Sequence, residues 1–343
     1  SYCFIRGRLA YSALSVEDVL RSFDVLWPAF GNRFDCVHFF GGEPSLRMDL
    51  LELVTQSALQ RYPAGSDLFP TVLISTNCLQ LSEPLLRYLI HHRQRALLIT
   101  SIDGPSWLHD WGRGVGSFSR IAETVARLRS EGIQIYNVTA VYGYRALRAG
   151  LSPYGIACQL VEQFQPVSIT FNLLYTTQRD ELLEPGVFYD QLLRSYQAAI
   201  EDFHSADEQR RKAAETFLHI DLLSIGGRSA YFCDFGIDSI AVFPGGLVDV
   251  CSDVPLFGIA PRACVHDADF ARQLAELRQR AKQQNAKSSV ASCRGCPAIG
   301  CCHMCTFWSP QRRAAHCAFV KRKHALLTGK HGDEVMLPAA CDP

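Results

Sequence analysis

The chain has 343 residues, and 34 Lys and Arg balance 34 Asp and Glu, so its formal net charge is zero. This length is enough for one large domain and a smaller one. A neutral chain has no global field that would draw it to nucleic acid or to an anionic membrane. No stretch approaches the roughly 20 continuous apolar residues of a membrane span. We therefore expect a cytoplasmic protein that binds neither nucleic acid nor membrane.

The first half of the chain alternates helical and strand patterns, which is typical of βαβ units around a parallel sheet. In chain order the patterns predict helix 15–27 with Ser15 as N-cap, strand 36–40, helix 47–60, strand 71–75, helix 83–92, strand 96–101, helix 117–131, strand 134–140, helix 154–164 and strand 167–172. A barrel or half-barrel of this kind places its active site at the C-terminal ends of the strands.

Unusual residues follow the predicted strands. Gly41-Gly42-Glu43-Pro44 comes after the first strand, Thr76-Asn77 closes the second, and Ser101-Ile-Asp-Gly104 closes the third. Glycine leaves the backbone open to close approach by a ligand at a strand end. The sequence therefore predicts a ligand site at this edge of the sheet.

The second half has a different pattern. Residues 186–223 are helical and charged, which indicates a bridge between domains. Residues 239–250 alternate around Pro244-Gly245-Gly246 and predict a β-hairpin. A helix is expected at 269–284, and a basic helix is expected to begin near Cys317.

Cysteine is abundant, with fourteen in the chain. A disulfide framework is typical of small secreted domains, and this chain is neither small nor recognisably secreted. The spacing instead indicates metal binding, because two-residue gaps point both sulfurs the same way. The ladder consists of Cys233, Cys251, Cys293, Cys296, Cys301, Cys302, Cys305 and Cys317, with Gly246 five positions before Cys251. Zinc ribbons and iron–sulfur clusters both use such pairs, so spacing alone leaves the two open.

With the motifs Phe40-Gly-Gly-Glu-Pro44, Ser75-Thr-Asn77 and Ser101-Ile-Asp-Gly-Pro105, this ladder resembles radical S-adenosylmethionine (SAM) enzymes with a C-terminal SPASM domain. That group includes the anaerobic sulfatase-maturating enzymes and many peptide maturases. The resemblance covers nearly the whole chain and favours iron–sulfur over zinc. It implies an α/β fold, a partial (β/α)6 TIM-type barrel followed by a small cysteine-rich iron–sulfur domain. We divide the chain into the barrel at 1–185, a helical bridge at 186–228, the SPASM domain at 229–330 and a tail at 331–343.

The resemblance also implies two auxiliary [4Fe–4S] clusters. One would be held by Cys293, Cys296, Cys317 and either Cys301 or Cys302. The chain misses the family spacing by one residue here, and we favour Cys301 because it keeps the three-residue gap to Cys305. The other cluster would use Cys233, Cys251 and Cys305, and no further cysteine precedes Cys233 to complete it.

A third, catalytic [4Fe–4S] cluster is held in the family by C-x3-C-x2-C. The chain begins Ser1-Tyr2-Cys3-Phe4 and matches only the last of these cysteines. Because Ser1 is not a natural start, we interpret the N-terminus as truncated within this motif. The resemblance also implies which residues surround SAM. Gly41, Gly42 and Glu43 would meet its amino group, and Ser101, Asp103 and Arg113 would lie beside its ribose. Pro44, Thr76 and Asn77 complete the expected set.

The implied function is formation of a 5′-deoxyadenosyl radical that takes a hydrogen atom from a peptide or protein substrate, with flavodoxin or ferredoxin as the reductase. Formylglycine formation is disfavoured, because those enzymes carry Asp directly after the second ladder cysteine and Ser252 follows Cys251 here. Two alternatives remain open. One is a radical SAM enzyme that acts on a small molecule. The other is a non-catalytic or electron-transfer iron–sulfur protein on a degenerate barrel.

Overall fold

The structure is a computed structural model of the whole chain. It describes residues 13–62, 70–173, 183–224, 230–231, 233, 235–254, 259–293, 295–299, 302–303, 305 and 308–328. The expectations for Cys3, for Cys301 and for the tail at 331–343 lie outside these residues.

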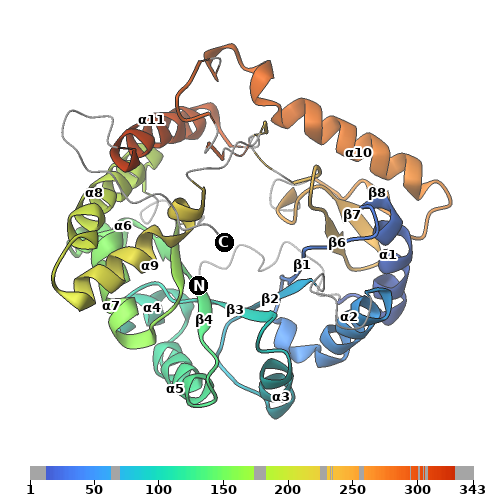
Figure 1. Cartoon of the computed structure of the whole chain (residues 1–343), viewed down its shortest axis with the longest axis horizontal. Coiled ribbons are helices and arrows are strands. Elements are labelled where there is room, and N and C mark those ends of the chain that lie inside the picture. The colour runs from blue at the N-terminus through green and yellow to red at the C-terminus, as the bar shows by residue number, and fades with distance from the viewer. Residues whose placement is uncertain are drawn as a thin grey trace.

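Five parallel strands form one curved sheet in the order β1-β2-β3-β4-β5. The strands are β1 (Cys36–Phe39), β2 (Thr71–Thr76), β3 (Ala96–Ser101), β4 (Ile135–Tyr142) and β5 (Ser168–Leu173). All five were predicted from the sequence. Strands that follow one another in the chain also pair in the sheet. The sheet curves as an arc, and the helices lie on its outside (Figure 1). The predicted α/β partial barrel is confirmed.

Helices α1 (Val16–Ala29), α2 (Met48–Arg61), α3 (Glu83–His91), α5 (Ser117–Ser130) and α7 (Pro153–Phe164) correspond to the five predicted helices. Ser15, Ser82 and Ser152 cap α1, α3 and α7 by accepting hydrogen bonds from backbone N–H groups in the first turn. Two helices were not predicted, α4 (Ser106–Arg113) and α6 (Tyr144–Arg148). Both are too short to establish a helical period in the sequence.

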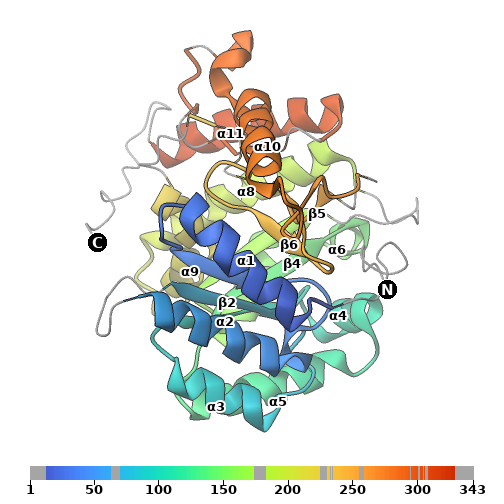
Figure 2. The same ribbon diagram turned by 90° about the vertical axis from the view of Figure 1, so that its right-hand side faces the viewer.

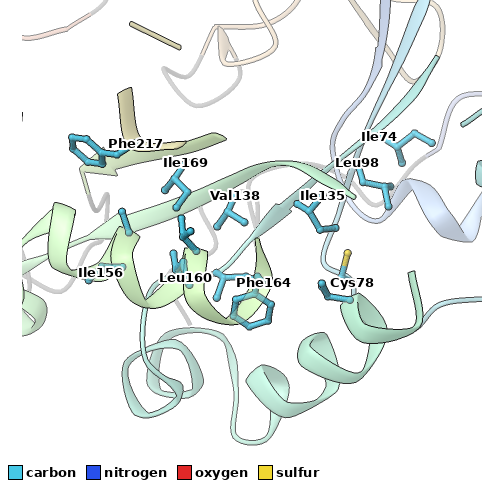
Figure 3. Packing of buried hydrophobic residues seen from close by; sticks show 14 of the residues in the cluster. Ile74, Cys78, Leu98, Ile135, Val138, Ile156, Leu160, Phe164, Ile169 and Phe217 are labelled. Carbon is cyan, nitrogen blue, oxygen red and sulfur yellow. The ribbon is translucent and has the colours of Figure 1, made fainter. Parts of the chain in front are cut away.

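The two faces of the sheet differ. Residues on the outer face, among them Ile74, Leu98, Val138 and Ile169, are buried against the surrounding helices (Figure 3). Burial alternates along β2 and β3, so the intervening side chains lie on the inner face. That face carries the polar residues His38, Ser75, Ser101, Asn137, Thr139, Ser168 and Thr170, together with the apolar residues Leu73, Leu97 and Ile99. The barrel interior therefore offers both polar and apolar side chains to a ligand.

The cysteine-rich half starts with a small antiparallel sheet of β6 (Ala241–Phe243), β7 (Leu247–Asp249) and β8 (Ala263–Cys264), so the predicted hairpin is confirmed. Helix α10 (Phe270–Asn285) packs on this sheet and forms a second hydrophobic cluster that includes Leu26 of α1. The small sheet and α10 lie beside α1, next to the β1 edge of the barrel (Figures 1 and 2).

Helices α8 (Pro185–Phe203), α9 (Glu208–Ser224) and α11 (Pro310–Leu327) lie at the β5 side. Helix α8 contacts both α9 and α11, and Phe319 and Val320 of α11 join the barrel's hydrophobic cluster. The prediction that the last helix begins near Cys317 was wrong. It begins at Pro310, because Ser309 accepts a hydrogen bond from the backbone N–H of Arg312 and caps the helix there. Among the described residues, none of the helices is both long and apolar enough to cross a bilayer.

Candidate functional site

The loop after β1 is open on one side and tied to β2 on the other. Gly41 has φ +131°, and a Cβ added at Gly41 or Gly42 would meet no atom within 4 Å. The Glu43 carboxylate accepts hydrogen bonds from the Ser45 hydroxyl at 2.6 Å and from the Asn77 backbone N–H at 2.8 Å. Glu43 thus holds the ends of β1 and β2 together, and the two glycines leave bare backbone beside them.

Thr76 and Asn77 end β2 in different ways. Thr76 is buried and its hydroxyl accepts a hydrogen bond from the backbone N–H of Cys78. Asn77 is exposed, and its side-chain oxygen accepts from the backbone N–H of Leu79 at 2.8 Å. Thr76 lies in the buried register of β2, so only its backbone is placed to meet a ligand inside the barrel.

After β3, Asp103 is 1% exposed and forms a bidentate ion pair with Arg113 of α4, at 2.6 and 2.9 Å. The same carboxylate accepts a hydrogen bond from the backbone N–H of Val141 in β4 at 2.9 Å. The backbone N–H of Asp103 donates to Nδ1 of buried His109, whose pKa is lowered by burial. Because Nδ1 accepts this bond, the ring is neutral. Asp103 therefore fixes Arg113, and the part of that pair which reaches solvent is the arginine.

Polar residues inside the barrel form two hydrogen-bonded groups. His38 on β1 and Ser75 on β2 are joined by a hydrogen bond of 2.8 Å between Nε2 and Oγ, and burial lowers the pKa of His38. On the other side of the arc, Asn137 donates to Ser168 at 2.8 Å and accepts from Thr139. Ser101 ends β3 between these two groups.

One group of ladder cysteines surrounds Cys302. Burial raises the pKa of the Cys302 thiol to about 11, and the nearby charges of Cys317, Cys293 and Cys296 raise it further, whereas that of Lys287 opposes the rise. Four cysteines thus share one electrostatic neighbourhood, although Cys293 and Cys317 are far apart in the chain. The preference for Cys301 over Cys302 is not tested by this grouping, since Cys301 is outside the described residues.

A second group surrounds Cys251 at the end of β7. Burial raises the pKa of this thiol to about 12, and the nearby charges of Asp253, Cys233 and Cys305 add to the rise, while its bond from the Asp253 backbone opposes it. That backbone N–H donates to Sγ of Cys251 at 3.3 Å. Cys264, on β8, has a different neighbour, because its thiol donates to the carbonyl of Gly245.

Within the part of the chain that the structure describes, no three His, Cys, Asp or Glu side chains converge as the ligands of a single metal ion would. Each cysteine of a [4Fe–4S] cluster binds its own iron, so its ligands need not meet at one point. Sequence reasoning missed the buried Lys287 beside the first group, because its neighbours 285–289 are polar and gave no sign of burial. Sequence reasoning also missed that Asp103 forms an ion pair with Arg113.

Residues 1–145 match the Radical SAM superfamily model. Among solved structures, the chain is similar to native anSMEcpe with bound AdoMet and Kp18Cys peptide, at 16% identity and a TM-score of 0.71, over 96% of this chain and 93% of that one. It is also similar to Streptococcus suis SuiB bound to S-adenosylmethionine, at 13% identity and a TM-score of 0.56, over 87% of this chain and 66% of that one. SuiB bound to precursor peptide SuiA gives 14% identity and a TM-score of 0.57, over 88% and 67%.

No curated protein sequence matches the chain. At these identities the structural likeness establishes the fold, while the match to the superfamily model covers β1 to β4 and the loops that follow β1, β2 and β3. Residues 1–145 are therefore similar in sequence to the Radical SAM superfamily, and the chain as a whole shares the fold of these structures.

Proposed function

We propose that this chain is a radical SAM enzyme that takes a hydrogen atom from a peptide or protein substrate. The observation that carries the proposal is the gathering of the ladder cysteines into two groups, in a chain whose residues 1–145 match the Radical SAM superfamily model. Two similar structures contain peptides, Kp18Cys in anSMEcpe and SuiA in SuiB, which supports the substrate class.

The residues present fit SAM at the open edge of the sheet. Gly41 and Gly42 provide bare backbone with free space beside it, and Glu43 fixes that backbone against Asn77. Arg113, held by Asp103, offers a fixed guanidinium at the end of β3. Asp103 would act through Arg113 rather than touch the ligand itself. Ser101, Pro44 and the backbone of Thr76 complete the proposed set, and Cys3 would bind the catalytic cluster.

The cysteine groups fit two auxiliary clusters. For one cluster we propose Cys293, Cys296, Cys317 and Cys302. Cys302 takes the place of Cys301, which the spacing favoured, because the charges of the other three cysteines act on the Cys302 thiol. Cys233, Cys251 and Cys305 would hold the other. When bound, a reduced catalytic cluster with SAM supplies a 5′-deoxyadenosyl radical, and the auxiliary clusters supply redox capacity. The protein's own contribution is to hold SAM against the sheet and to present the substrate to the inner face.

This assignment keeps the proposed division of the chain. The barrel at 1–185 would bind SAM, the helices of 186–228 would connect the halves, and 229–330 would hold the auxiliary clusters. A flavodoxin or ferredoxin would supply the electron.

The test uses protein expressed from its complete natural reading frame and reconstituted anaerobically with iron and sulfide. With dithionite and SAM we expect 5′-deoxyadenosine and methionine, measured by liquid chromatography and mass spectrometry. Cys3→Ala should abolish the product. Cys36→Ala is the matched control and should retain it, since Cys36 lies at the opposite end of β1 from the loop.

Two results would overturn the proposal. Stoichiometric zinc without labile sulfide would replace the iron–sulfur assignment by a structural zinc site. Full clusters with no SAM cleavage would favour an electron-transfer protein.

The substrate class is tested separately, with peptides encoded beside the gene. A mass loss of about two units per modification, as expected for removal of two hydrogen atoms in an oxidative cross-link, would support it. Unchanged peptides together with consumption of a small metabolite would replace the peptide by a small molecule.

A further inference from the structure

Lys287 is a charged residue in an interior position. It lies in a short 3₁₀ helix (Lys287–Ser289) between α10 and the cysteine block, and it is 2% exposed. Buried lysines are rare, because removing an ammonium from water is costly unless a partner compensates it. Lys282 and Ser288, which lie within five residues of Lys287, are exposed, whereas Asn285 is buried like Lys287.

The partners of Lys287 belong to the segment that carries two ladder cysteines. Its Nζ donates a hydrogen bond to the carbonyl of Ile299, which closes a loop that contains Cys293 and Cys296. Inside that loop, successive backbone bonds run from Cys293 N–H to Val290 and from Cys296 N–H to Cys293, at 3.0 and 3.1 Å. The backbone N–H of Lys287 is itself held by the carbonyl of Ala230 at 3.0 Å. Lys287 is therefore held both at its backbone N–H and at its side-chain ammonium.

Hydrogen bonds connect this ammonium to the cysteine segment. Ile299, whose carbonyl accepts from Nζ of Lys287, donates its own backbone N–H to the carbonyl of Cys296 at 3.1 Å and lies three residues before Cys302. A charge acts on its neighbours more strongly in a protein interior than in water, because the effective dielectric constant is lower. Any centre that becomes more negative on reduction is stabilised in its reduced form by a fixed positive charge beside it.

We propose that Lys287 is a positioning residue that raises the reduction potential of the auxiliary cluster held by Cys293, Cys296, Cys302 and Cys317. This inference rests on the proposed function, since it requires that cluster.

A purely structural role predicts something different. If Lys287 only closes the 287–299 loop, its replacement should lower cluster content and leave the potential of the remaining clusters unchanged. The reduction potential is thus the readout that separates the two roles, and enzyme activity is not needed for it.

The experiment is a potentiometric titration of the anaerobically reconstituted full-length protein, followed by electron paramagnetic resonance. Cys302→Ala identifies the signal of the cluster in question by its loss. Lys287→Gln removes the charge and keeps a hydrogen-bond donor, Lys287→Arg keeps the charge, and Lys282→Gln removes a charge from an exposed position five residues away. We expect Lys287→Gln to shift the one-electron equilibrium of this cluster at least tenfold toward the oxidised form, which lowers its reduction potential by about 59 mV. The reduction potential should fall less in Lys287→Arg and should stay unchanged in Lys282→Gln.

An unchanged potential in Lys287→Gln with full cluster content would overturn the inference and leave the proposed function standing. Equal falls of the reduction potential in the Lys287→Gln and Lys287→Arg variants would also overturn the inference, because the charge of Lys287 would then not be the cause of the fall. If neither variant assembles the cluster, Lys287 is structural and the inference fails. A wild-type protein without iron and sulfide would overturn the proposed function itself.

Discussion

Substitution of Gly246 by alanine should destabilise the hairpin that leads to Cys251. Gly246 has φ +68°, and a Cβ there would lie 2.6 Å from Cδ2 of His266 and 2.7 Å from Cγ2 of Val265. Val265 is fully buried, and His266 is held by a hydrogen bond of 2.9 Å between its Nε2 and the carboxylate of Asp18 in α1. Neither neighbour can move without breaking a contact, so the added methyl group must displace the turn.

The neighbouring glycine provides a matched control. Gly245 has φ +77°, and a Cβ there would meet no atom within 4 Å. Both alanine variants carry the cost of a left-handed conformation, about 1–2 kcal/mol. Only Gly246→Ala adds overpacking, which costs about 1–3 kcal/mol. We therefore expect Gly246→Ala to lose about 2–5 kcal/mol of stability and Gly245→Ala about 1–2 kcal/mol.

The assay is thermal unfolding of anaerobic protein by scanning calorimetry, with iron and sulfide measured on the same samples. Gly246→Ala should unfold at a lower temperature than Gly245→Ala and should retain less iron, because β7 carries the chain to Cys251. Equal losses in the two variants would refute the reasoning, since the steric contact of the added Cβ is the difference on which the prediction rests.

Three further outcomes follow from the site. Arg113→Met should lower the free energy of unfolding by about 3 kcal/mol, because it leaves the buried carboxylate of Asp103 without its cationic partner. Adding Asp103→Asn to this variant should recover part of that free energy in urea unfolding. Strictly additive losses would contradict the ion-pair argument. Cys302→Ala should lower the iron content by one cluster while Cys264→Ala leaves it unchanged, and equal iron contents in the two variants would argue against the assigned group. Burial raises the pKa of Cys302 to about 11 and that of Cys251 to about 12, so both thiols hold protons at neutral pH and release them when iron binds. Cluster assembly should therefore require less free iron as the pH rises from about 7 to about 8.5. Reconstitution titrations measure this requirement, and a flat or opposite pH dependence would contradict the argument.

The sequence by itself determined the order of the barrel elements and predicted the edge of the sheet that we propose as the SAM site. Strands such as Ala96–Ser101 are read from a local run of apolar residues between turn signals, and five of them with helical connections dictate a parallel sheet. Gly41 and Glu43 were found because a strand end with consecutive glycines is a local pattern. The metal-binding class was likewise readable, because thiolate pairs at two-residue spacing are close in the chain before any folding occurs.

Tertiary structure decided which side chains meet. Asp18 and His266 are distant in sequence, and only docking of the small sheet on α1 brings them to 2.9 Å. The pairing of Asp103 with Arg113 depends on α4, which was too short to predict. Lys287 stands in a polar segment whose composition indicates exposure, yet the fold buries it with its ammonium against the carbonyl of Ile299. The physical reason is the same in each case: spacing along the chain fixes local geometry, whereas burial and charge contacts depend on how separate elements pack.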